Sequence, residues 1–381
     1  SQIAPSNSNN QPKTVDLIFD GIRVHDNDLS KKIPPEQNLQ FSPLSAQVSI
    51  NAAQMTIYYL GGLMYYYPKD DIFGPVYDFA NTTDALQKST NVKLKLSNSV
   101  FYNEKNVSQQ FLDDLVAYHH SELYKVSFES QDNETALASF NDWISKKTNG
   151  RGQKIDQLTT RRSSLVQISV ISFTGCWDKQ KNSANIIKTL KFKTAKEEIT
   201  TDALHATEKI GYYNNTESKY EVIKLPYKNG EFAMAIVLPY PDQQLMDVFK
   251  KPNNEKAYHQ IFDQINSHEE SIEYTVPVLN LGSISLNEKG TEVNGDNPIV
   301  CDTPSAPVQQ LTTSQGTNKQ FYVNRPFAVF IYDVKTKYVL VHALVKNPTS
   351  KHSSVNILGN GQKSEPDIRV SNLYELFNLH A

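Results

Sequence analysis

Three features that would point to common functions are missing from this chain. It has no apolar run long enough to cross a membrane as a helix. Its 38 basic and 41 acidic residues nearly cancel to a net charge of −3, so we expect neither a nucleic-acid surface nor a membrane surface. It also lacks a Gly-x-Ser-x-Gly elbow, a His-Glu-x-x-His pair and a phosphate-binding glycine loop, so no enzyme activity, cofactor or metal is expected.

The composition is that of a soluble globular protein, with 39% hydrophobic and 21% charged residues. The length of 381 residues suits one large domain or two to three ordinary ones. Residues 1–14 are rich in Ser, Asn and Pro, which predicts a flexible lead-in. Beyond them, helical and strand patterns alternate without a regular βαβ rhythm, which favours an α+β fold with mostly antiparallel or mixed sheets.

Two helices are predicted near the N-terminus. Ser42 can cap a helix that starts at Pro43. The apolar face of that helix would carry Leu44, Val48, Ala52 and Met55. An earlier amphipathic helix is predicted by the i, i+3, i+4, i+7 spacing of Val15, Ile18, Phe19 and Ile22.

Strand patterns are clearest in the second half of the chain. Two apolar segments, residues 222–225 and 232–238, are joined through residues 227–230 (Tyr-Lys-Asn-Gly). Because Asn-Gly suits a type I′ turn, we predict a β-hairpin there. Two further strands are predicted at residues 327–332 and 338–345.

Several separated motifs resemble those of one known family. The motifs are residues 41–45 (Phe-Ser-Pro-Leu-Ser), 140–150 (Phe-Asn-Asp-Trp-Ile-Ser-Lys-Lys-Thr-Asn-Gly), 173–177 (Phe-Thr-Gly-Cys-Trp), 324–327 (Asn-Arg-Pro-Phe) and 345–348 (Val-Lys-Asn-Pro). Residues 286–293 (Leu-Asn-Glu-Lys-Gly-Thr-Glu-Val) resemble the hinge of a serpin's reactive loop. On these motifs the chain is identified as a divergent member of the serpin family over roughly residues 15–348.

The resemblance implies a single serpin-like domain over residues 15–348, with helices, large mostly antiparallel or mixed sheets and an exposed reactive loop at about 290–320. It also implies a mechanism. The loop serves as bait and, once cleaved, inserts as a strand of the main sheet and drags the attached protease with it. A serine or cysteine protease is the implied partner, and the protein is expected to be a monomer.

The hinge residues implied by the resemblance are Glu288, Gly290, Thr291, Val293 and Gly295. Strand alternation places Thr291, Val293 and Gly295 on the core face, and Glu292, Asn294 and Asp296 on the other. Small or apolar residues would then face inward, as insertion requires.

The end of the hinge opposes full insertion. Residues 294–298 (Asn-Gly-Asp-Asn-Pro) contain an Asn-Gly turn signal, and Pro298 lacks the N–H that a central strand needs. The alternative to an inhibitor is therefore a non-inhibitory serpin that acts as a binding, carrier, structural or storage protein.

The candidate reactive bond joins Leu311 and Thr312, although counting from Gly290 and counting back from Pro326 give different positions. The loop has no Arg before Arg325, and Lys319 is its one other basic residue. We therefore expect a chymotrypsin-like or cysteine protease as target rather than a trypsin-like one.

The chain departs from the family pattern in two places. Residues 271–287 are too few for the two strands and the helix that serpins place before the hinge. The chain also continues beyond the last family motif as residues 349–381, where a strand leading into a helix is predicted. One hypothesis is that this tail takes the place of the missing strand and helix. A disordered or loosely docked extension is the alternative.

Four glycosylation triplets point to secretion. They begin at Asn81, Asn106, Asn133 and Asn214. No signal peptide is visible, and the chain starts at Ser1 without Met, as a processed product would. We therefore expect a secreted, extracellular glycoprotein.

Cys176 and Cys301 are the only cysteines. The serpin fold would place Cys176 near the point where the loop leaves the main sheet, so a disulfide could tether the loop. Two free thiols are favoured over the disulfide, because Cys176 also fits as a small buried residue.

Two polar groups have an ordinary explanation. His119 and His120 would point about 100° apart on a helix, which predicts a solvated face rather than a metal site. A basic cluster could bind a sulfated polysaccharide, although a solvated surface is favoured. Its members are Lys146, Lys147, Arg151, Lys154, Arg161 and Arg162.

Overall fold

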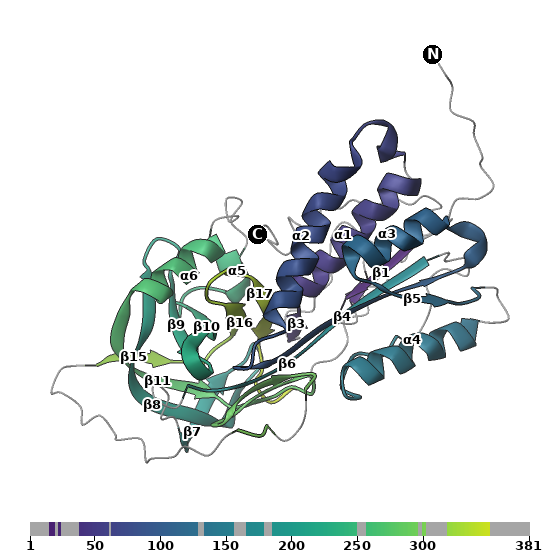
Figure 1. The fold of residues 1–381 in the computed structure, drawn as a ribbon. Coiled ribbons are helices and arrows are strands. Elements are labelled where there is room, and N and C mark those ends of the chain that lie inside the picture. Colours follow the sequence, from purple (N-terminus) through teal and green to yellow (C-terminus); the bar gives the residue numbers. More distant parts are fainter. Residues whose placement is uncertain are drawn as a thin grey trace.

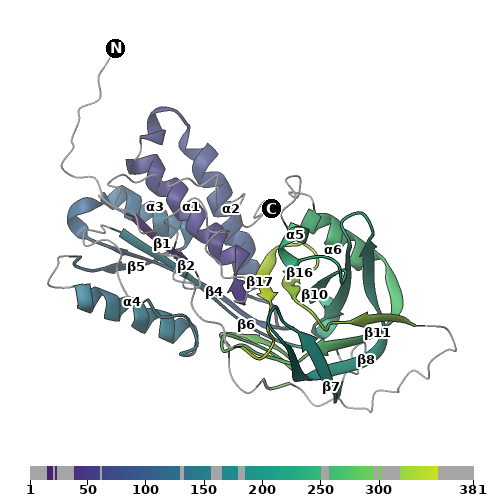
Figure 2. The same ribbon diagram turned by 180° about the vertical axis from the view of Figure 1, so that it is seen from behind.

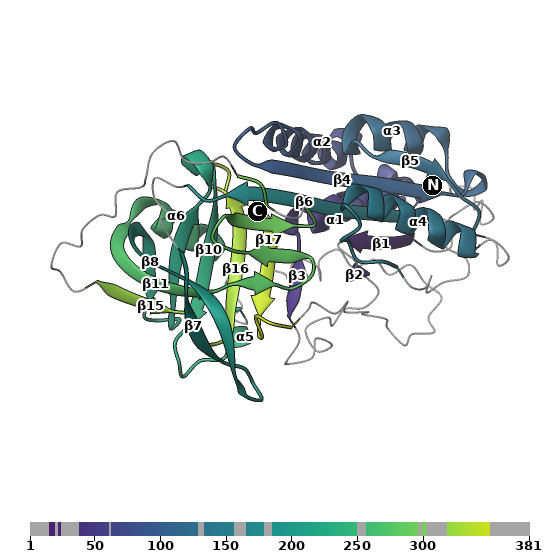
Figure 3. The same ribbon diagram turned by 90° about the horizontal axis from the view of Figure 1, so that it is seen from below.

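The computed structural model describes residues 15–19, 22–23, 38–60, 62–128, 133–155, 165–178, 185–249, 257–295, 299–301 and 318–350. They form two β-sheets with helices (Figure 1). Most helices gather at one end of the molecule, and the strands of the second sheet gather at the other (Figures 1 and 3). No helix among the described residues is long and apolar enough to cross a membrane.

The first sheet has eight strands arranged around one long strand, β6. Its strands are β1 (Val15–Phe19), β2 (Ile22–Arg23), β4 (Lys93–Tyr102), β5 (Glu122–Lys125), β6 (Leu165–Cys176), β12 (Leu279–Asn280), β13 (Ile284–Leu286) and β14 (Gly290–Val293). Strand β4 runs antiparallel to β6 and pairs with it from Thr174 to Leu165. It therefore covers one edge of β6 almost completely. The opposite edge, called the β6 edge below, pairs with β14 and β1.

The second sheet has nine strands in the order β15-β11-β8-β9-β10-β16-β17-β3, with β7 paired to β8. Their bounds are β3 (Leu39–Phe41), β7 (Asn185–Lys193), β8 (Glu198–Asn215), β9 (Tyr220–Pro226), β10 (Phe232–Pro239), β11 (Glu269–Pro277), β15 (Lys319–Tyr322), β16 (Phe327–Asp333) and β17 (Val339–Val345). The largest apolar core lies where this sheet packs on the first, and it includes the fully buried Phe173, Phe232 and Ile331.

The helices are α1 (Pro43–Leu60), α2 (Lys69–Leu86), α3 (Gln109–His119), α4 (Asn133–Lys147), α5 (Leu245–Phe249) and α6 (Ala257–Ser267), with short 3₁₀ turns η2 (Leu63–Tyr65), η3 (Glu104–Asn106) and η4 (Lys228–Gly230). Helices α5 and α6 pack on the second sheet, whereas the first four cover both faces of the first sheet. Helices α1, α2 and α3 lie on one side of β4 and β6, and α4 lies on the other (Figure 1). Side-chain packing agrees, because Val166 and Ile168 pack under α4 while Gln167, between them, accepts a hydrogen bond from Ser49 of α1.

Most local predictions are confirmed. The Ser42 hydroxyl accepts a hydrogen bond from the Ser45 N–H at the start of α1 (3.1 Å). The face predicted to be apolar is buried, namely Leu44, Val48, Ala52 and Met55. Strands β9 and β10 form the predicted hairpin. Its turn is closed by a hydrogen bond from the Gly230 N–H to the Tyr227 carbonyl (2.8 Å), and Asn229 and Gly230 have positive φ angles of 62° and 69°. The central residues Lys228 and Asn229 differ from the type I′ turn that Asn-Gly suggested. Strands β16 and β17 are also antiparallel neighbours.

Two predictions are wrong. Residues 15–19 and 22–23 form strands β1 and β2 rather than an amphipathic helix. His119 is buried, with 3% of its surface exposed, instead of lying on a solvated face. The lead-in (residues 1–14) and nearly all of the tail (residues 351–381) lie outside the described residues. The hypothesis that the tail takes the place of the missing strand and helix concerns these same residues, so it stays a prediction.

Candidate reactive-loop site

The hinge segment is already a strand of the first sheet. Strand β14 lies between β13 and β6 and runs antiparallel to both. On the β6 side, Gly290 pairs with Cys176 and Val293 pairs with Phe173. We call residues 173–176 the upper part of the β6 edge. A loop that should wait outside the sheet has therefore begun to insert.

Close contact between β14 and β6 explains the glycine at the start of the hinge. A Cβ atom on Gly290 would lie 2.0 Å from the Gly175 carbonyl oxygen, so no other residue fits there without a shift of the backbone. A tight turn leads into the strand, in which the Asn287 N–H donates to the Gly290 carbonyl (3.0 Å). Glu288 lies exposed in this turn.

The predicted alternation of the hinge agrees with the structure, but its outer face is covered. Thr291 and Val293 are fully buried, and Val293 belongs to the main core. Glu292 points to the opposite face, where it is also fully buried and forms an ion pair with Arg151, just beyond α4. Removing these two charges from water is unfavourable unless they pair, so the contact depends on both partners.

The turn after α4 holds the hinge in several ways. Arg151 also donates to the carbonyl oxygens of Gly282 (2.6 Å) and Gly295 (3.4 Å). Asn149 donates to the Asn294 carbonyl (3.3 Å). Burial lowers the pKa of Arg151 below its ordinary value. The guanidinium thus ties three parts of the site together: the inserted strand, its turn and the neighbouring β12–β13 connection.

Insertion stops one residue after β14. The Asn294 main-chain N–H still donates to the Ser283 carbonyl (2.9 Å), and its side-chain amide donates to the Ile171 carbonyl (3.1 Å). Asn294 has a φ of 50°, in the left-handed region that Asn tolerates better than most residues. The backbone therefore leaves the strand at the Asn-Gly signal noted in the sequence.

A disulfide returns the chain to the top of the sheet. Cys301 is bonded to Cys176, and their Cα atoms are 5.9 Å apart, so the favoured prediction of two free thiols is wrong. Because Gly290 pairs with this same Cys176, the segment 290–301 enters the sheet and comes back to the residue where it started. The depth of insertion is limited by this closed loop.

The rest of the β6 edge is also occupied. Strand β1 runs parallel to β6, with Val15 beside Leu165 and Phe19 beside Ser169. We call residues 165–169 the lower part of the β6 edge. The strand that pairs with it, β1, comes from the N-terminal segment, for which the sequence predicted no contact with the main sheet. Figures 2 and 3 show β1 and β2 at the helical end of the molecule, near α1 and α4.

The other predicted site residues are more scattered. Leu311 and Thr312 lie outside the described residues. Asn81 on α2 and Asn214 near the end of β8 are exposed, and Asn214 Oδ1 accepts a hydrogen bond from the Tyr240 hydroxyl (2.6 Å). Asn106 lies in η3 and Asn133 begins α4, but their side chains are not among those described.

The basic cluster is largely neutralised. Lys146 pairs with Asp142 (2.8 Å) and Lys147 pairs with Glu122 (2.7 Å). Arg151 is committed to Glu292, and Lys154 is exposed. Arg161 and Arg162 lie outside the described residues. Little positive charge is thus left for a sulfated polysaccharide among the described members.

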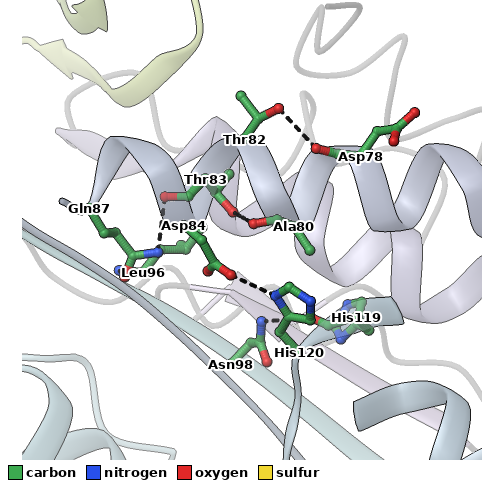
Figure 4. Close-up of polar contacts among 10 residues, drawn as sticks. All are labelled: Asp78, Ala80, Thr82, Thr83, Asp84, Gln87, Leu96, Asn98, His119 and His120. Atoms are coloured by element: carbon green, nitrogen blue, oxygen red, sulfur yellow. Dashed lines mark hydrogen bonds and ion pairs between the residues drawn. The ribbon is translucent and has the colours of Figure 1, made fainter. Parts of the chain in front are cut away.

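A cleft of about 430 Å³ lies between α1, α2, β4 and the end of α3. Val48, Val76 and Ala80 supply apolar lining. Asp84 and His120 also line the cleft, and a hydrogen bond of 2.7 Å joins the Asp84 carboxylate to His120 Nδ1 (Figure 4). His119 is fixed by its ring nitrogens, since Nε2 donates to the Val48 carbonyl (2.8 Å) and Nδ1 accepts from the Ser121 hydroxyl. Burial lowers the pKa of His119 to about 4, so the ring is neutral. Among the described residues, no group of side chains could hold a metal ion.

Two functional residues were missed at the level of sequence. The sequence places Arg151 in a basic cluster and predicts an outward-facing Glu292, and it indicates no partner for either residue. Their pairing depends on the position of α4 over the sheet, which the local sequence does not specify. One signal was available, because a charged residue in a strand that must insert needs a partner.

Comparisons with known proteins match this architecture. The family model described as "Serpin (serine protease inhibitor)" matches residues 27–283, and this match ends before the hinge. Iripin-1 of Ixodes ricinus is 22% identical over 352 residues, covering 81% of this chain and 88% of that protein. Antithrombin-III of Homo sapiens is 24% identical over 327 residues, covering 72% and 67%.

Solved structures show the same fold. A complex of thyroxine-binding globulin with thyroxine has a TM-score of 0.61 at 16% identity, covering 83% of this chain and 94% of that one. Serpin-12 of Manduca sexta has a TM-score of 0.62 at 16% identity, covering 86% and 97%. Since the family model covers more than half of its length, the chain belongs to the serpin (serine protease inhibitor) family.

Proposed function

We propose that the protein is a secreted protease inhibitor that presents residues 302–317 as bait and holds its protease without inserting a long loop strand. Membership of the family supports protease inhibition in general, and serpins are generally inhibitors rather than enzymes. One observation carries the specific part of the proposal. The β6 edge, which an inserting strand must use, is taken by β14 in its upper part and by β1 in its lower part.

Full insertion requires unpaired backbone groups along the β6 edge, because the inserted strand is held by main-chain hydrogen bonds to its neighbours. Residues 165–169 and 173–176 already have strand partners, and Asn294 reaches Ile171 in the gap between them. Residues that follow Cys301 start from the top of the sheet, where Cys301 is bonded to Cys176. A cleaved loop would have to displace β14, β1 or both before it could travel down the edge.

The bait segment is anchored on both sides. Cys301 fixes its N-terminal end to β6, and its C-terminal end continues into β15, which pairs with β11. Cleavage at Leu311–Thr312 would leave both new ends tied to the body. A protease that binds such a segment meets a substrate whose products cannot diffuse away, which favours reversible inhibition.

The sequence of the bait indicates the protease class. Leu311 suits an apolar specificity pocket, and residues 302–318 contain no Lys or Arg. We propose a chymotrypsin-like or cysteine protease as the target. The proposed secretion is supported by the exposed Asn81 and Asn214 and by the disulfide, which persists best in an oxidising compartment.

The test is a panel of purified chymotrypsin-like, trypsin-like and cysteine proteases incubated with the full chain. We expect inhibition of the first or third class that is lost on dilution, with no complex that survives SDS. The Leu311→Arg variant should redirect inhibition to the trypsin-like enzyme. A stoichiometric SDS-stable complex would show that the loop inserts fully. Absence of inhibition across the panel would support the non-inhibitory alternative.

The cleft beside α1 and α2 favours a second candidate function, that of a ligand carrier. Its volume of about 430 Å³ and its mixed lining suit a small amphipathic molecule. One fold neighbour was solved as a complex with thyroxine, so a serpin fold can hold such a molecule. Binding of an apolar fluorescent probe that the cleft-filling variant Ala80→Trp abolishes would support this function. Equal binding by the variant would contradict it.

A further inference from the structure

The lower part of the β6 edge needs an occupant. Helix α1 covers one face of β6, where Ser49 donates to Gln167, and α4 packs on the other against Val166 and Ile168. Water therefore has little access to the main-chain groups between them. Buried N–H and C=O groups are almost always paired, so an open edge at this place would be costly.

The strands that precede the hinge are too short to supply that occupant. Strand β13 has only three residues and β12 only two. Strand β13 lies between β12 and β14, and its pairing with β14 extends only along residues 291–293. Nothing in the described part of the chain between β11 and β14 reaches residues 165–169. This is the structural consequence of the short segment noted in the sequence.

Strand β1 fills this gap. It pairs with all five residues of the lower part, and β2 pairs with it on the outer side through Ile18 and Phe19. The two side chains described for β1 are deeply buried, with Asp16 at 0% and Leu17 at 2% exposure. The segment is thus integrated in the sheet rather than resting on its surface.

Strands β1 and β14 meet end to end. Strand β14 descends from Cys176 to Phe173, whereas β1 ascends from Leu165 to Ser169. Only residues 170–172 separate their positions, and the Asn294 side chain already bonds Ile171 there. An extension of β14 by more than three residues would therefore reach the position beside Ser169 that Phe19 already occupies.

We propose that the lower part of the β6 edge is a strand-binding site whose resident ligand is the chain's own N-terminal hairpin, β1–β2. The ligand class is an extended peptide that pairs in parallel with residues 165–169. While the hairpin is bound, it also fixes the place where the reactive loop must leave the sheet. This inference explains the short insertion on which the proposed function relies, but it holds whether or not any protease is inhibited.

The first test measures hydrogen exchange of the full, disulfide-intact chain. Amides of residues 15–19 and 165–169 should be protected together. The Leu17→Pro variant removes one N–H from the middle of β1, and it should lower protection of both segments by about tenfold or more while residues 290–293 stay protected. The matched variant Leu17→Val keeps the N–H and should resemble the unmodified protein.

Adding a ligand in trans tests binding directly. A synthetic peptide with the sequence of residues 15–23 should restore protection of residues 165–169 in the Leu17→Pro variant, and a scrambled peptide should not. If residues 15–19 exchange freely in the unmodified protein, or if Leu17→Pro leaves residues 165–169 protected, the proposal is wrong. A failure of the peptide to restore protection would also contradict a strand-binding site.

A second measurement covers the case in which Leu17→Pro does not fold. Ile18 lies beside Ile168, so the pair Ile18→Cys and Ile168→Cys should form an additional disulfide. The pair Ile18→Cys and Phe173→Cys should not, because Phe173 pairs with Val293. Cross-linking of the second pair but not the first would place β1 elsewhere and overturn the proposal. None of these measurements involves a protease. A negative result would therefore contradict the strand-binding site without bearing on protease inhibition.

Discussion

The upper and lower parts of the β6 edge pair with two strands that lie far apart in the sequence, β14 and β1. Different interactions hold these two strands in place. In the upper part, β14 is fixed by an ion pair, a disulfide and a close backbone contact at Gly290. In the lower part, β1 is held by main-chain pairing and by burial between helices. The upper strand depends on a few specific side chains, whereas the lower one depends on an edge that must be covered.

This difference matters for a serpin, because a reactive loop can insert only where the edge is open. A strand held by a few side chains can be released by single substitutions. A strand held by its whole backbone is released only when the ladder itself is disrupted. The upper part should therefore be sensitive to point mutations and to redox conditions, and the lower part to disturbance of the packing above it.

The largest effect is expected for Arg151→Ala. This change leaves the fully buried Glu292 carboxylate without its cation, which typically costs about 3–5 kcal/mol of unfolding free energy. Urea denaturation measures the loss, and hydrogen exchange should show β14 opening while β1 stays protected. The double variant Arg151→Ala with Glu292→Gln should recover much of it.

An exposed cation provides the control for that experiment. Lys154→Ala should change stability by less than about 0.5 kcal/mol, since Lys154 is exposed. Equal effects at Arg151 and Lys154 would mean that the ion pair does not hold the upper part.

The disulfide should rank second. Replacing both Cys176 and Cys301 by Ser opens a loop of sequence separation 125, for which a loss of about 2–4 kcal/mol is typical. We expect a lower melting temperature and, after cleavage within residues 302–317, more exchange in β14 than the intact bond permits. Alkylation of both cysteines in the native protein without prior reduction would show that the bond is absent.

Substitution of Gly290 should have a smaller effect. A methyl group there would lie 2.0 Å from the Gly175 carbonyl oxygen. The backbone shift that this overpacking requires usually lowers the free energy of unfolding by about 1–3 kcal/mol. The Gly290→Ala variant should lose protection in β14 and keep it in β1. Gly74→Ala is the control, because apart from its chain neighbours nothing lies within 4 Å of its Cβ position. Since Pro75 follows it in α2, the new Cβ should bring no gain in stability, and protection of β14 should not change.

Much of the upper part could be predicted from the sequence, and little of the lower part could. The alternation of Thr291, Glu292 and Val293 fixed which side chains face the core, and the Asn-Gly pair marked where the strand ends. These are local signals. The partner of Glu292 was not predictable, because Arg151 reaches it only after α4 has packed across the sheet.

The N-terminal segment shows why local patterns failed in the lower part. Val15, Ile18, Phe19 and Ile22 fit a helical period, but β-branched residues also suit strands, and a short segment can follow either. The segment forms a strand because it pairs with the edge of β6, which lies about 150 residues later in the sequence. The burial of His119 also depends on tertiary packing. Its ring bonds Val48 of α1, and the residues next to His119 in the sequence do not predict that contact.

The most gradual effect concerns acid, because its loss of stability is spread over about two pH units, and it should act on the lower part. His119 donates from Nε2 to the Val48 carbonyl on α1, the helix that covers the lower part of the β6 edge. Burial lowers its pKa from 6.5 to about 4, so the unfolded chain takes up a proton at a higher pH than the folded one. Stability contributed by the neutral ring is complete above pH 6.5 and is lost as the pH falls toward 4.

The expected slope for this one group is about 1 kcal/mol per pH unit between pH 6 and pH 4.5. Urea denaturation across this range should give a shallower slope for His119→Gln, which keeps a donor for Val48 but does not titrate. His342, whose pKa burial lowers to about 3, remains in both proteins and supplies a common background. Hydrogen exchange at pH 5 should show β1 loosening before β14. If β14 opens first, acid acts through the upper part, and the assignment of His119 to the support of the lower part is wrong.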